Sequence, residues 1–384
     1  MKKGLALVLA LVMALSLVAC GSGNNGGGNN NGGNGGNGGN NGGDGGSAGG
    51  DGMNISVLYY NYSDAFISNV RNEMDAKWAE MGITANNQDG QTNAGTQLDQ
   101  VNTAIANGAQ ALVVNAVEAS ADETTQAIVD AAKNANIPVI FFNREVSDDV
   151  VNSYELAAFV GTDPKEAGHM QGELIGNYLV ENYDAVDLNG DGVISYVMFK
   201  GQENNPEAEY RTQYAVEDAN AILEAAGKPA LAYYDSAAAT QYLVDPNGSW
   251  SAAAAQDYMT TILSAYSEAN GNMVELVIAN NDDMGLGAIT ALQTAGYNQG
   301  VDENGEPLST NIPVFTVDGL QGIVDAINAG TATGAVGQSA SGLASAVVTL
   351  VQNYQADGDL MSNTEGMNVD ETVAKIRVPY TTVS

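Results

Sequence analysis

The stretch from Asp187 to Ser195, with the sequence DLNGDGVIS, has the composition of a calcium-binding loop. Gly192 stands at the sixth loop position, where the chain must turn sharply, and the carbonyl of Val193 is available at the seventh. An EF-hand loop closes with a bidentate Glu at its twelfth position, but here that position is Met198. The pattern therefore indicates calcium chemistry but does not identify the carboxylate that would close the loop. The side-chain oxygens at the first, third and fifth positions belong to Asp187, Asn189 and Asp191.

Polar side chains also follow several apolar runs of the sequence. In open parallel sheets, ligands bind beyond the carboxyl ends of the strands, so residues in these places are candidates for a binding site. Each of them taken alone is equally well explained as a turn residue or a helix N-cap. The candidates are Asn61 to Asp64, Asn143 and Arg144, Asn281 to Asp283, and Asp318.

The net charge and the scarcity of His and Cys exclude nucleic-acid binding and several kinds of catalysis. The formal net charge is −34, with 46 acidic and 12 basic residues, which excludes a nucleic-acid partner. The chain has one His, and its one Cys is Cys20, close to the N-terminus. Catalysis by His or Cys and the usual zinc sites are therefore excluded, whereas chemistry based on Asp remains open.

The elements that must position these side chains follow from the apolar pattern. Six short runs rich in β-branched residues predict buried strands, and amphipathic helical segments such as 123–137 separate them. This alternation predicts an α/β fold with doubly wound parallel sheets, and the body from Met53 onward is long enough for two domains. The predicted strands are 54–60, 111–117, 137–143, 193–200, 274–281 and 312–318.

The N-terminal segment predicts export. Residues 1–19 combine a basic start with an apolar stretch that is too short to span a membrane, as in a signal peptide. The sequence LVAC resembles the lipobox of bacterial lipoproteins, in which Cys20 would carry lipid; the alternative is an ordinary signal peptide with an incidental Cys. Residues 20–52 would then form a Gly- and Asn-rich tether with a reach of about 30 Å. We expect a protein anchored by lipid to the outer face of the cell membrane.

The body resembles a known family. Its pieces YSDAF, PVIFFNRE, FVGTDPKEAG, DLNGDG, EYRT, ELVIANNDDMG and IPVFTVDG are similar, in order and spacing, to the galactose/glucose-binding proteins of bacterial ABC sugar importers. The match leaves two apparent insertions, at Ser236–Ser249 and Asn298–Ser309. The resemblance implies two α/β lobes joined by a three-strand hinge, with a ligand cleft between them. It places the crossings near Gly161, near Ala340 and just before Ile376. The lobes would comprise 53–161 with 341–375, and 162–340 with 376–384.

The resemblance also implies a sugar site. Two aromatic rings, Phe66 and Trp250, would stack on the faces of a pyranose, although core packing and anchoring of a long loop are the alternative roles of these two residues. Polar side chains would surround the sugar's hydroxyl groups and exchange hydrogen bonds with them. These would be Asp64, Asn143, Asn205, Glu207, Arg211, Asn281, Asp318 and Gln338.

Three of these positions depart from the family pattern. Asn205 stands where a His is usual, Glu207 where an Asp is usual, and Gln338 where an Asn is usual. The last two side chains are one methylene longer, so the ligand or the backbone must shift to compensate. These departures leave a monosaccharide as the expected ligand but leave the choice among glucose, galactose and related sugars open.

Family members with the loop described above bind one Ca²⁺, and a distant Glu completes the site. The matching residue is Glu275, and Ser195 stands at the ninth loop position, where the family often has Gln. The resemblance thus implies one structural Ca²⁺ held by Asp187, Asn189, Asp191, Val193, Ser195 and Glu275. The alternative is an Asx-rich turn without metal.

The function implied by the resemblance is delivery of a monosaccharide to an ABC permease and its ATPase, by a monomer without catalytic activity. Two alternatives remain open. A sensor subunit would present the same bound sugar to a receptor kinase or chemoreceptor. A secreted glycosidase would use Asp64 with Asp318 or Glu207 as its pair of carboxylates.

Overall fold

The structure is a computed structural model that describes residues 52–384. The expected signal peptide, the lipidation site Cys20 and residues 20–51 of the expected tether lie outside the described residues. Within residues 52–384, no helix has both the length and the apolar character needed to cross a membrane.

The first lobe is built on a sheet with the strand order β12-β13-β5-β4-β3-β1-β2. Its strands are parallel, except that β12 runs antiparallel to β13 at one edge. Helices cover both faces, because alternate strand residues such as Val57 and Leu58 pack into different clusters of the core. The strands are β1 (Ile55–Tyr59), β2 (Asn86–Asp89), β3 (Ala111–Val114), β4 (Val139–Phe142), β5 (Ala157–Gly161), β12 (Asn368–Val369) and β13 (Lys375–Arg377). One face carries α1 (Ala65–Glu80) and α10 (Ala340–Asp357), and the other carries α2 (Ala94–Ala106), α3 (Asp122–Ala135) and α4 (Asp148–Asn152).

The second lobe repeats this plan with the strand order β14-β11-β10-β9-β6-β7, and β8 also pairs with β6. All of its pairs are parallel except that between β11 and β14. The strands are β6 (Ser195–Lys200), β7 (Ala232–Tyr233), β8 (Leu243–Val244), β9 (Leu276–Ala279), β10 (Val314–Asp318), β11 (Gly334–Gly337) and β14 (Thr381–Val383). One face carries α5 (Pro164–Val186) and α6 (Pro206–Ala225), and the other carries α7 (Ala252–Ala265), α8 (Asp282–Thr294) and α9 (Gln321–Asn328). A short 3₁₀ helix, Glu268–Asn270, precedes β9.

Helices α5 and α6 lie unusually close together. A Cβ atom added at Gly168 of α5 would lie 2.4 Å from the carbonyl oxygen of Tyr210 on α6. Glycine therefore allows the two helix backbones to approach each other, and this packing fixes the first turns of α6 beside the chain crossings. Those turns carry Glu207 and Arg211.

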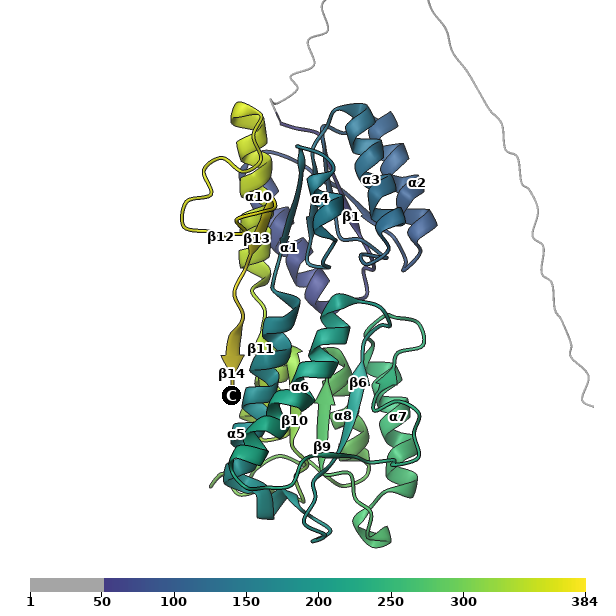
Figure 1. Cartoon of the computed structure of the whole chain (residues 1–384), viewed down its shortest axis with the longest axis vertical. Coiled ribbons are helices and arrows are strands. Elements are labelled where there is room, and N and C mark those ends of the chain that lie inside the picture. Colours follow the sequence, from purple (N-terminus) through teal and green to yellow (C-terminus); the bar gives the residue numbers. More distant parts are fainter. Residues whose placement is uncertain (1–51) are drawn as a thin grey trace, which may run out of the picture. The chain divides into compact units, whose positions relative to one another are not determined.

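The chain passes between the lobes at three places (Figure 1). The first passage lies between β5 and α5, and the second lies between β11 and α10. The third lies between Arg377 and Thr381, later than the position just before Ile376 that the resemblance suggested. Ile376 pairs with Val160 and Arg377 with Gly161, so β13 remains part of the first sheet through Arg377.

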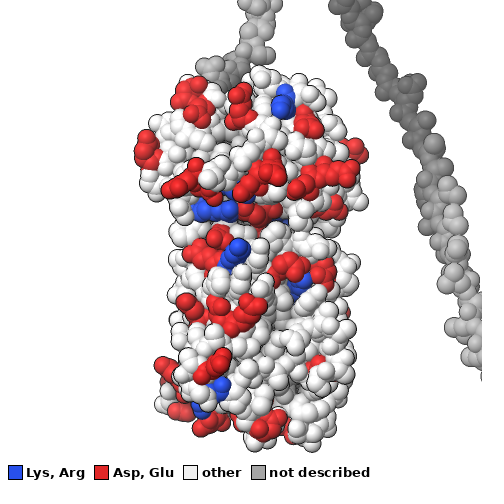
Figure 2. Space-filling view, viewed as in Figure 1, with Lys and Arg blue, Asp and Glu red and all other residues white. Residues whose placement is uncertain are grey.

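The predicted fold class, two α/β lobes built on doubly wound sheets, is confirmed, with an antiparallel strand added at one edge of each sheet. Figure 2 shows acidic side chains spread over both lobes on the face drawn, with few basic ones among them. The charge on this face is distributed rather than gathered into a basic stripe, as expected for a solvated acidic surface.

Candidate functional site

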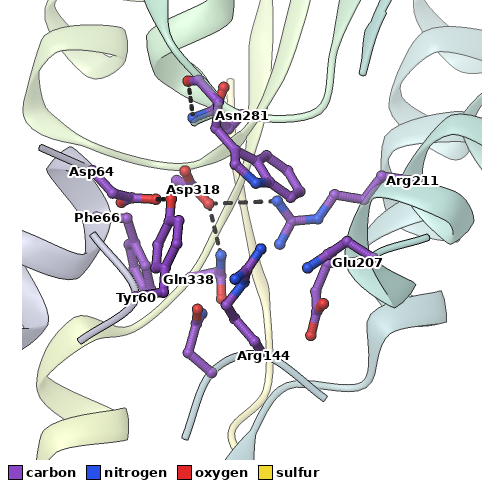
Figure 3. A pocket seen from close by; sticks show the side chains of 12 residues that line it. Tyr60, Asp64, Phe66, Arg144, Glu207, Arg211, Asn281, Asp318 and Gln338 are labelled. Carbon is purple, nitrogen blue, oxygen red and sulfur yellow. Dashed lines mark hydrogen bonds and ion pairs between the residues drawn. The ribbon is translucent and has the colours of Figure 1, made fainter. Parts of the chain in front are cut away.

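A pocket is lined by residues of both lobes (Figure 3). The structure brings together at this pocket every residue that the sequence analysis expected to bind sugar. From the first lobe come Asp64, Phe66 and Asn143, and from the second Asn205, Glu207, Arg211, Trp250, Asn281, Asp318 and Gln338. Tyr60 and Arg144 also line it.

Three lining residues are also helix N-caps. The side-chain oxygens of Asp64, Asn205 and Asn281 accept hydrogen bonds from the first-turn N–H groups of α1, α6 and α8, at 2.8, 3.1 and 3.1 Å. The sequence left open whether Asp64 and Asn281 are caps or site residues, and the structure shows that they cap helices and line the pocket. The pocket therefore faces three helix N-termini, whose partial positive charge favours carboxylates and hydroxyl oxygens.

Backbone strain is concentrated at the same place. Asn143, Trp250 and Asp318 have φ angles of 65°, 58° and 132°. Such values are uncommon for residues with a side chain, and they persist where the surrounding structure enforces them, often at functional sites.

The loop that holds Trp250 is built around a buried aspartate. One carboxylate oxygen of Asp245 accepts hydrogen bonds from the N–H and hydroxyl of Ser251 at 2.9 and 2.7 Å. The carbonyl of Trp250 accepts a hydrogen bond from Asn281 at 3.1 Å, and its ring lies directly over Gly201, where a Cβ would come within 2.0 Å of the indole. The apparent insertion Ser236–Ser249 thus leads into a turn that places the indole in the pocket.

Arg211 and Asp318 form the charged centre of the pocket. The guanidinium donates to the carbonyl of Asn280 at 2.8 Å and to the hydroxyl of Tyr380 at 3.2 Å, and it lies 3.7 Å from the Asp318 carboxylate. Asp318 also accepts a hydrogen bond from the amide of Gln338 at 2.6 Å. Burial raises the pKa of Asp318 well above its ordinary value, and Arg211 opposes this shift.

A second carboxylate, Asp282, is buried behind the pocket. It accepts hydrogen bonds from the hydroxyl of Thr316 and, at 2.6 Å, from the N–H of Leu320. Burial raises its pKa to about 7, against the effect of these hydrogen bonds. The pKa of the Glu207 carboxyl is also raised, again chiefly by burial. Asp318, Asp282 and Glu207 are thus held in a strongly desolvated setting.

Three polar atoms of lining residues are buried and have no hydrogen-bond partner within residues 52–384. They are Oε2 of Glu207, Nε of Arg211 and Oε1 of Gln338. Two of these are acceptors and one is a donor, so a ligand with several hydroxyl groups can satisfy all of them. Leaving such groups without partners costs about 1–3 kcal/mol each, which is a reason to expect a polar ligand.

Tyr60 was missing from the expected site, and Arg144 was a strand-end candidate that the expected set of sugar-binding residues did not include. The Tyr60 hydroxyl donates to Asp64 at 2.5 Å, and the Arg144 guanidinium lies over the Tyr60 ring at 4.2 Å. Arg144 donates to the carbonyls of Ala116 and Val117 at 2.8 and 2.6 Å, and also to the side chain of Gln202 in the second lobe. Arg144 had been noted at a strand end, whereas Tyr60 closes an apolar run and looked like part of the strand.

The structure places Glu275 against the loop at Asp187–Ser195. Glu275 is fully buried, and its two oxygens accept hydrogen bonds from the N–H groups of Asn189 at 3.1 Å and Ser195 at 2.9 Å. The hydroxyl of Ser195 donates to the carbonyl of Met273 at 2.6 Å. Burial raises the pKa of Glu275, so the carboxylate form would gain from a cation at this place.

Within the loop, side-chain oxygens face backbone N–H groups. Oδ2 of Asp187 accepts from Gly192 at 2.9 Å, Asn189 from Asp191 at 2.8 Å, and Asp191 from Val193 at 2.9 Å. Oδ1 of Asp187 is buried without a partner in the described part of the chain. In residues 52–384, no three His, Cys, Asp or Glu side chains gather as a metal centre. The all-oxygen donor set and the unpaired Asp187 oxygen nevertheless fit a hard cation such as Ca²⁺.

Residues 55–359 match the periplasmic binding protein domain family. The D-galactose/methyl-galactoside binding periplasmic protein MglB of Haemophilus influenzae is 36% identical over 327 residues, which cover 85% of this chain and 88% of that protein. The galactofuranose-binding protein YtfQ of Escherichia coli is 25% identical over 73% of this chain and 74% of its own.

Solved structures show the same fold. An ABC transporter solute-binding protein of Clostridium phytofermentans with bound β-D-glucose has a TM-score of 0.66 at 19% identity, over 86% of this chain and 93% of its own. One of Bacillus halodurans with bound myo-inositol has a TM-score of 0.62 at 23% identity, over 88% and 96%. The chain therefore belongs to the periplasmic binding protein family, and it is a solute-binding protein rather than an enzyme.

Proposed function

We propose that this protein captures a monosaccharide of the D-galactose/D-glucose class and delivers it to an ABC transporter permease. The observation that carries the proposal is the set of three buried pocket atoms, on Glu207, Arg211 and Gln338, that have no hydrogen-bond partner among residues 52–384. A sugar supplies hydroxyl groups that donate to the two acceptors and accept from the guanidinium. The galactose ligand of the Haemophilus relative supports the choice of sugar class.

Recognition would combine stacking with hydrogen bonding. Phe66 of the first lobe and Trp250 of the second supply aromatic faces for the apolar C–H surfaces of a pyranose. Asp64, Asn143 and Asn281 supply polar groups at strand and helix ends. Because both lobes contribute lining residues, bringing the lobes together would remove the sugar from water and strengthen each polar contact.

The transport proposal includes the membrane. Export directed by residues 1–19 and lipid on Cys20 would hold the protein at the outer face of the cell membrane, with residues 20–52 as a tether. Its partners would be the permease and, through it, the ATPase that powers uptake.

We also propose one structural Ca²⁺ in the second lobe. Asp187, Asn189, Asp191, Val193 and Glu275 would hold it, with Ser195 nearby. The ion would join the loop before β6 to the start of β9. It would also neutralise the carboxylate of Glu275, whose charged form is disfavoured by burial.

The test is a binding panel by calorimetry and thermal shift, with D-galactose, D-glucose, D-xylose, D-ribose and L-arabinose, each with and without EDTA. We expect the two hexoses to bind and to raise the melting temperature more than the pentoses do. Failure of every sugar to bind would overturn the transport proposal.

Tryptophan fluorescence gives a matched control, because the chain has two Trp residues, Trp78 and Trp250. Trp250 lines the pocket and Trp78 lies in the core of the first lobe. A sugar-dependent fluorescence change should persist in Trp78→Phe and disappear in Trp250→Phe. The reverse result would place the ligand away from this pocket.

A further inference from the structure

A second cavity lies beside the pocket and shares Asn205 with it. One wall of this second cavity is formed by residues 117–121 of the first lobe, in the link from β3 to α3. The other wall is formed by residues 202–205 of the second lobe, in the link from β6 to α6. At Asn205, therefore, one side chain separates the two cavities.

A contact between the lobes also lies between the two cavities. Arg144 lines the pocket (Figure 3), and its guanidinium donates to Gln202, which lines the second cavity. The same guanidinium donates at 2.6 Å to the carbonyl of Val117, which lies in the other wall of the second cavity. The side chains that border the pocket on this side thus also border the second cavity.

The side chain at position 205 leaves room between the cavities. Asn205 stands where the family that the sequence resembles usually has a His, and an amide has fewer atoms than an imidazole ring. Its oxygen caps α6 by accepting from the N–H of Ala208 at 3.1 Å, so its amide N–H groups remain as donors. A donor at this place suits the acceptor oxygen that links two sugar rings.

The second cavity combines apolar surface with amide donors. Val117 and Ala119 are 4% and 3% exposed and present apolar surface at its inner side. Gln202 accepts from Arg144 through its Oε1, so its amide N–H groups remain as donors. This combination matches the C–H groups and hydroxyl oxygens of a sugar ring.

The charge of the lining disfavours an acidic substituent. Glu118 and Glu203 line the second cavity, and its lining includes no Lys or Arg among the residues that the structure describes. Lys200 lies behind the lining and pairs with Glu203 at 2.7 Å. A phosphate or carboxylate in this cavity would therefore meet like charges without a lining cation to pair with, whereas a neutral hydroxylated group would not.

The mouth of the second cavity is exposed. Glu118, Ser120, Glu203 and Asn204 are exposed residues, and the Ser120 hydroxyl donates to the carbonyl of Asn204 across the gap between the lobes. A substituent that is longer than the cavity can therefore continue into water.

We propose that the second cavity is a subsite for the substituent of an O-substituted hexose, such as the second ring of a disaccharide whose first ring lies in the pocket. This inference rests on the proposed function, because a hexose ring must occupy the pocket. It extends the ligand class from free monosaccharides to hexosides with a neutral, hydroxylated substituent. Asn205 donates to the linking oxygen and Gln202 to a hydroxyl group of the substituent, so both are specificity-determining residues.

The first test is calorimetry of the full-length mature protein with free hexoses and neutral disaccharides. The ligands are D-galactose, D-glucose, lactose, melibiose, cellobiose and gentiobiose, which vary the linkage between the two rings. We expect at least one disaccharide to bind within about ten-fold of its free hexose, because the added contacts offset the cost of ordering a larger ligand. If the free hexoses bind and every disaccharide fails, the subsite is refuted and the proposed function stands. If no sugar binds, the proposed function itself is refuted.

The second test fills the cavity. Glu118→Trp places a large side chain in the lining of the second cavity and changes no residue that lines the pocket. We expect the affinity for the bound disaccharide to fall by about ten-fold or more and that for the free hexose to stay within about two-fold. Glu224→Trp, at an exposed position of α6, is the matched control and should change neither affinity.

Thermal unfolding without sugar shows whether each variant is folded. If Glu118→Trp does not fold, Ser120→Trp provides the same block from a neighbouring lining residue. In a folded variant, an unchanged disaccharide affinity would show that the second ring lies elsewhere. An equal loss of hexose and disaccharide affinity would show that the cavity does not distinguish the two ligands. Either result overturns the inference.

Discussion

Arg211 connects the pocket to the crossings between the lobes. Its guanidinium donates to the hydroxyl of Tyr380 in the third crossing at 3.2 Å, and that hydroxyl lies 2.7 Å from the hydroxyl of Thr162 in the first. Its Nε is buried without a partner in the described residues. One side chain therefore offers a donor to the ligand and also supports the hinge.

Replacing Arg211 by Met should lower the affinity for the preferred sugar by about 2–3 kcal/mol, or tens- to about a hundred-fold. The reason is that the change removes a buried ligand donor and leaves Asp318 without its compensating charge. Calorimetry measures the affinity. Lys228→Met, at a pair with Asp184 on the surface, is the control and should bind as the wild type does. An unchanged affinity in Arg211→Met would show that Arg211 does not bind the sugar.

Asp282 should make stability depend on pH. Its pKa in the folded state is raised to about 7, so the folded protein holds this proton more tightly than the unfolded chain does. Its contribution to stability is complete below the unfolded-state pKa and is lost as the pH rises through about 7. Between about pH 4 and about pH 8, wild-type stability should therefore fall relative to that of Asp282→Asn.

Denaturant unfolding of the two proteins across this pH range measures the difference. Asp257→Asn, at an exposed position of α7, controls for the general effect of removing a carboxylate and should run parallel to the wild type. If the free energies of unfolding of the wild type and Asp282→Asn change with pH in the same way, the pKa of Asp282 is not raised in the folded protein.

For individual residues, the sequence predicted most of the residues that line the pocket, but only through the family resemblance. Composition and strand-end position flagged Asp64, Asn143 and Asp318 without deciding between a cap and a ligand-binding role. Tyr60 was not flagged because it reaches the pocket through contacts with Asp64 and Arg144, and such contacts depend on the folded geometry rather than on local pattern.

At the scale of elements, six strands within the two sheets were predicted, whereas β5, β11 and β13, which also have neighbours on both sides, were missed together with the edge strands. Runs such as 137–143 and 312–318 are apolar because both faces of a central parallel strand are covered by helices. By contrast, β2 has the sequence NNQD at the edge of the first sheet and is largely half-exposed, so it carries no apolar signal. Its pairing with β1 is set by tertiary structure.

The loop before β6 gives a prediction about calcium. If Ca²⁺ joins this loop to Glu275, EDTA should lower the melting temperature by a few degrees, because an ion bound only by the folded state stabilises it. Added Ca²⁺ should restore the melting temperature, and Asp187→Asn should reduce the response. Differential scanning calorimetry makes the measurement.

Asp302→Asn is the control, because Asp302 also accepts backbone hydrogen bonds in an acidic turn, within the apparent insertion Asn298–Ser309. Its response to EDTA should equal that of the wild type. If EDTA leaves the melting temperatures of the wild type, Asp187→Asn and Asp302→Asn unchanged, the loop is better described as an Asx-rich turn without metal.

At the scale of the whole described body, the two lobes lie together over the pocket. The N–H of Glu145 donates to the carboxylate of Glu207, Arg144 donates to Gln202, and the hydroxyl of Ser120 donates to the carbonyl of Asn204. We expect these contacts to break before a ligand enters. The apolar pattern predicted two domains, whereas the cleft and the three crossings came from the resemblance, because periodicity carries no information on how separate sheets are joined.

A disulfide between Ser120→Cys and Asn204→Cys should trap this arrangement. In a mature protein whose native Cys20 is replaced by Ala, the oxidised double variant should fail to take up sugar, and reduction should restore binding. Calorimetry before and after reduction makes the measurement, with Ser120→Cys alone as the control. Normal uptake by the fully oxidised protein would mean that ligand enters without separation of the lobes.

The position of the third crossing has a consequence for biosynthesis. Residues 375–383 add a strand to each sheet, β13 to the first and β14 to the second. Since a ribosome makes the chain from its N-terminus, neither sheet can acquire all its strands until residues 375–383 are being translated. The nascent chain is thereby kept from completing either lobe before the third crossing has been made.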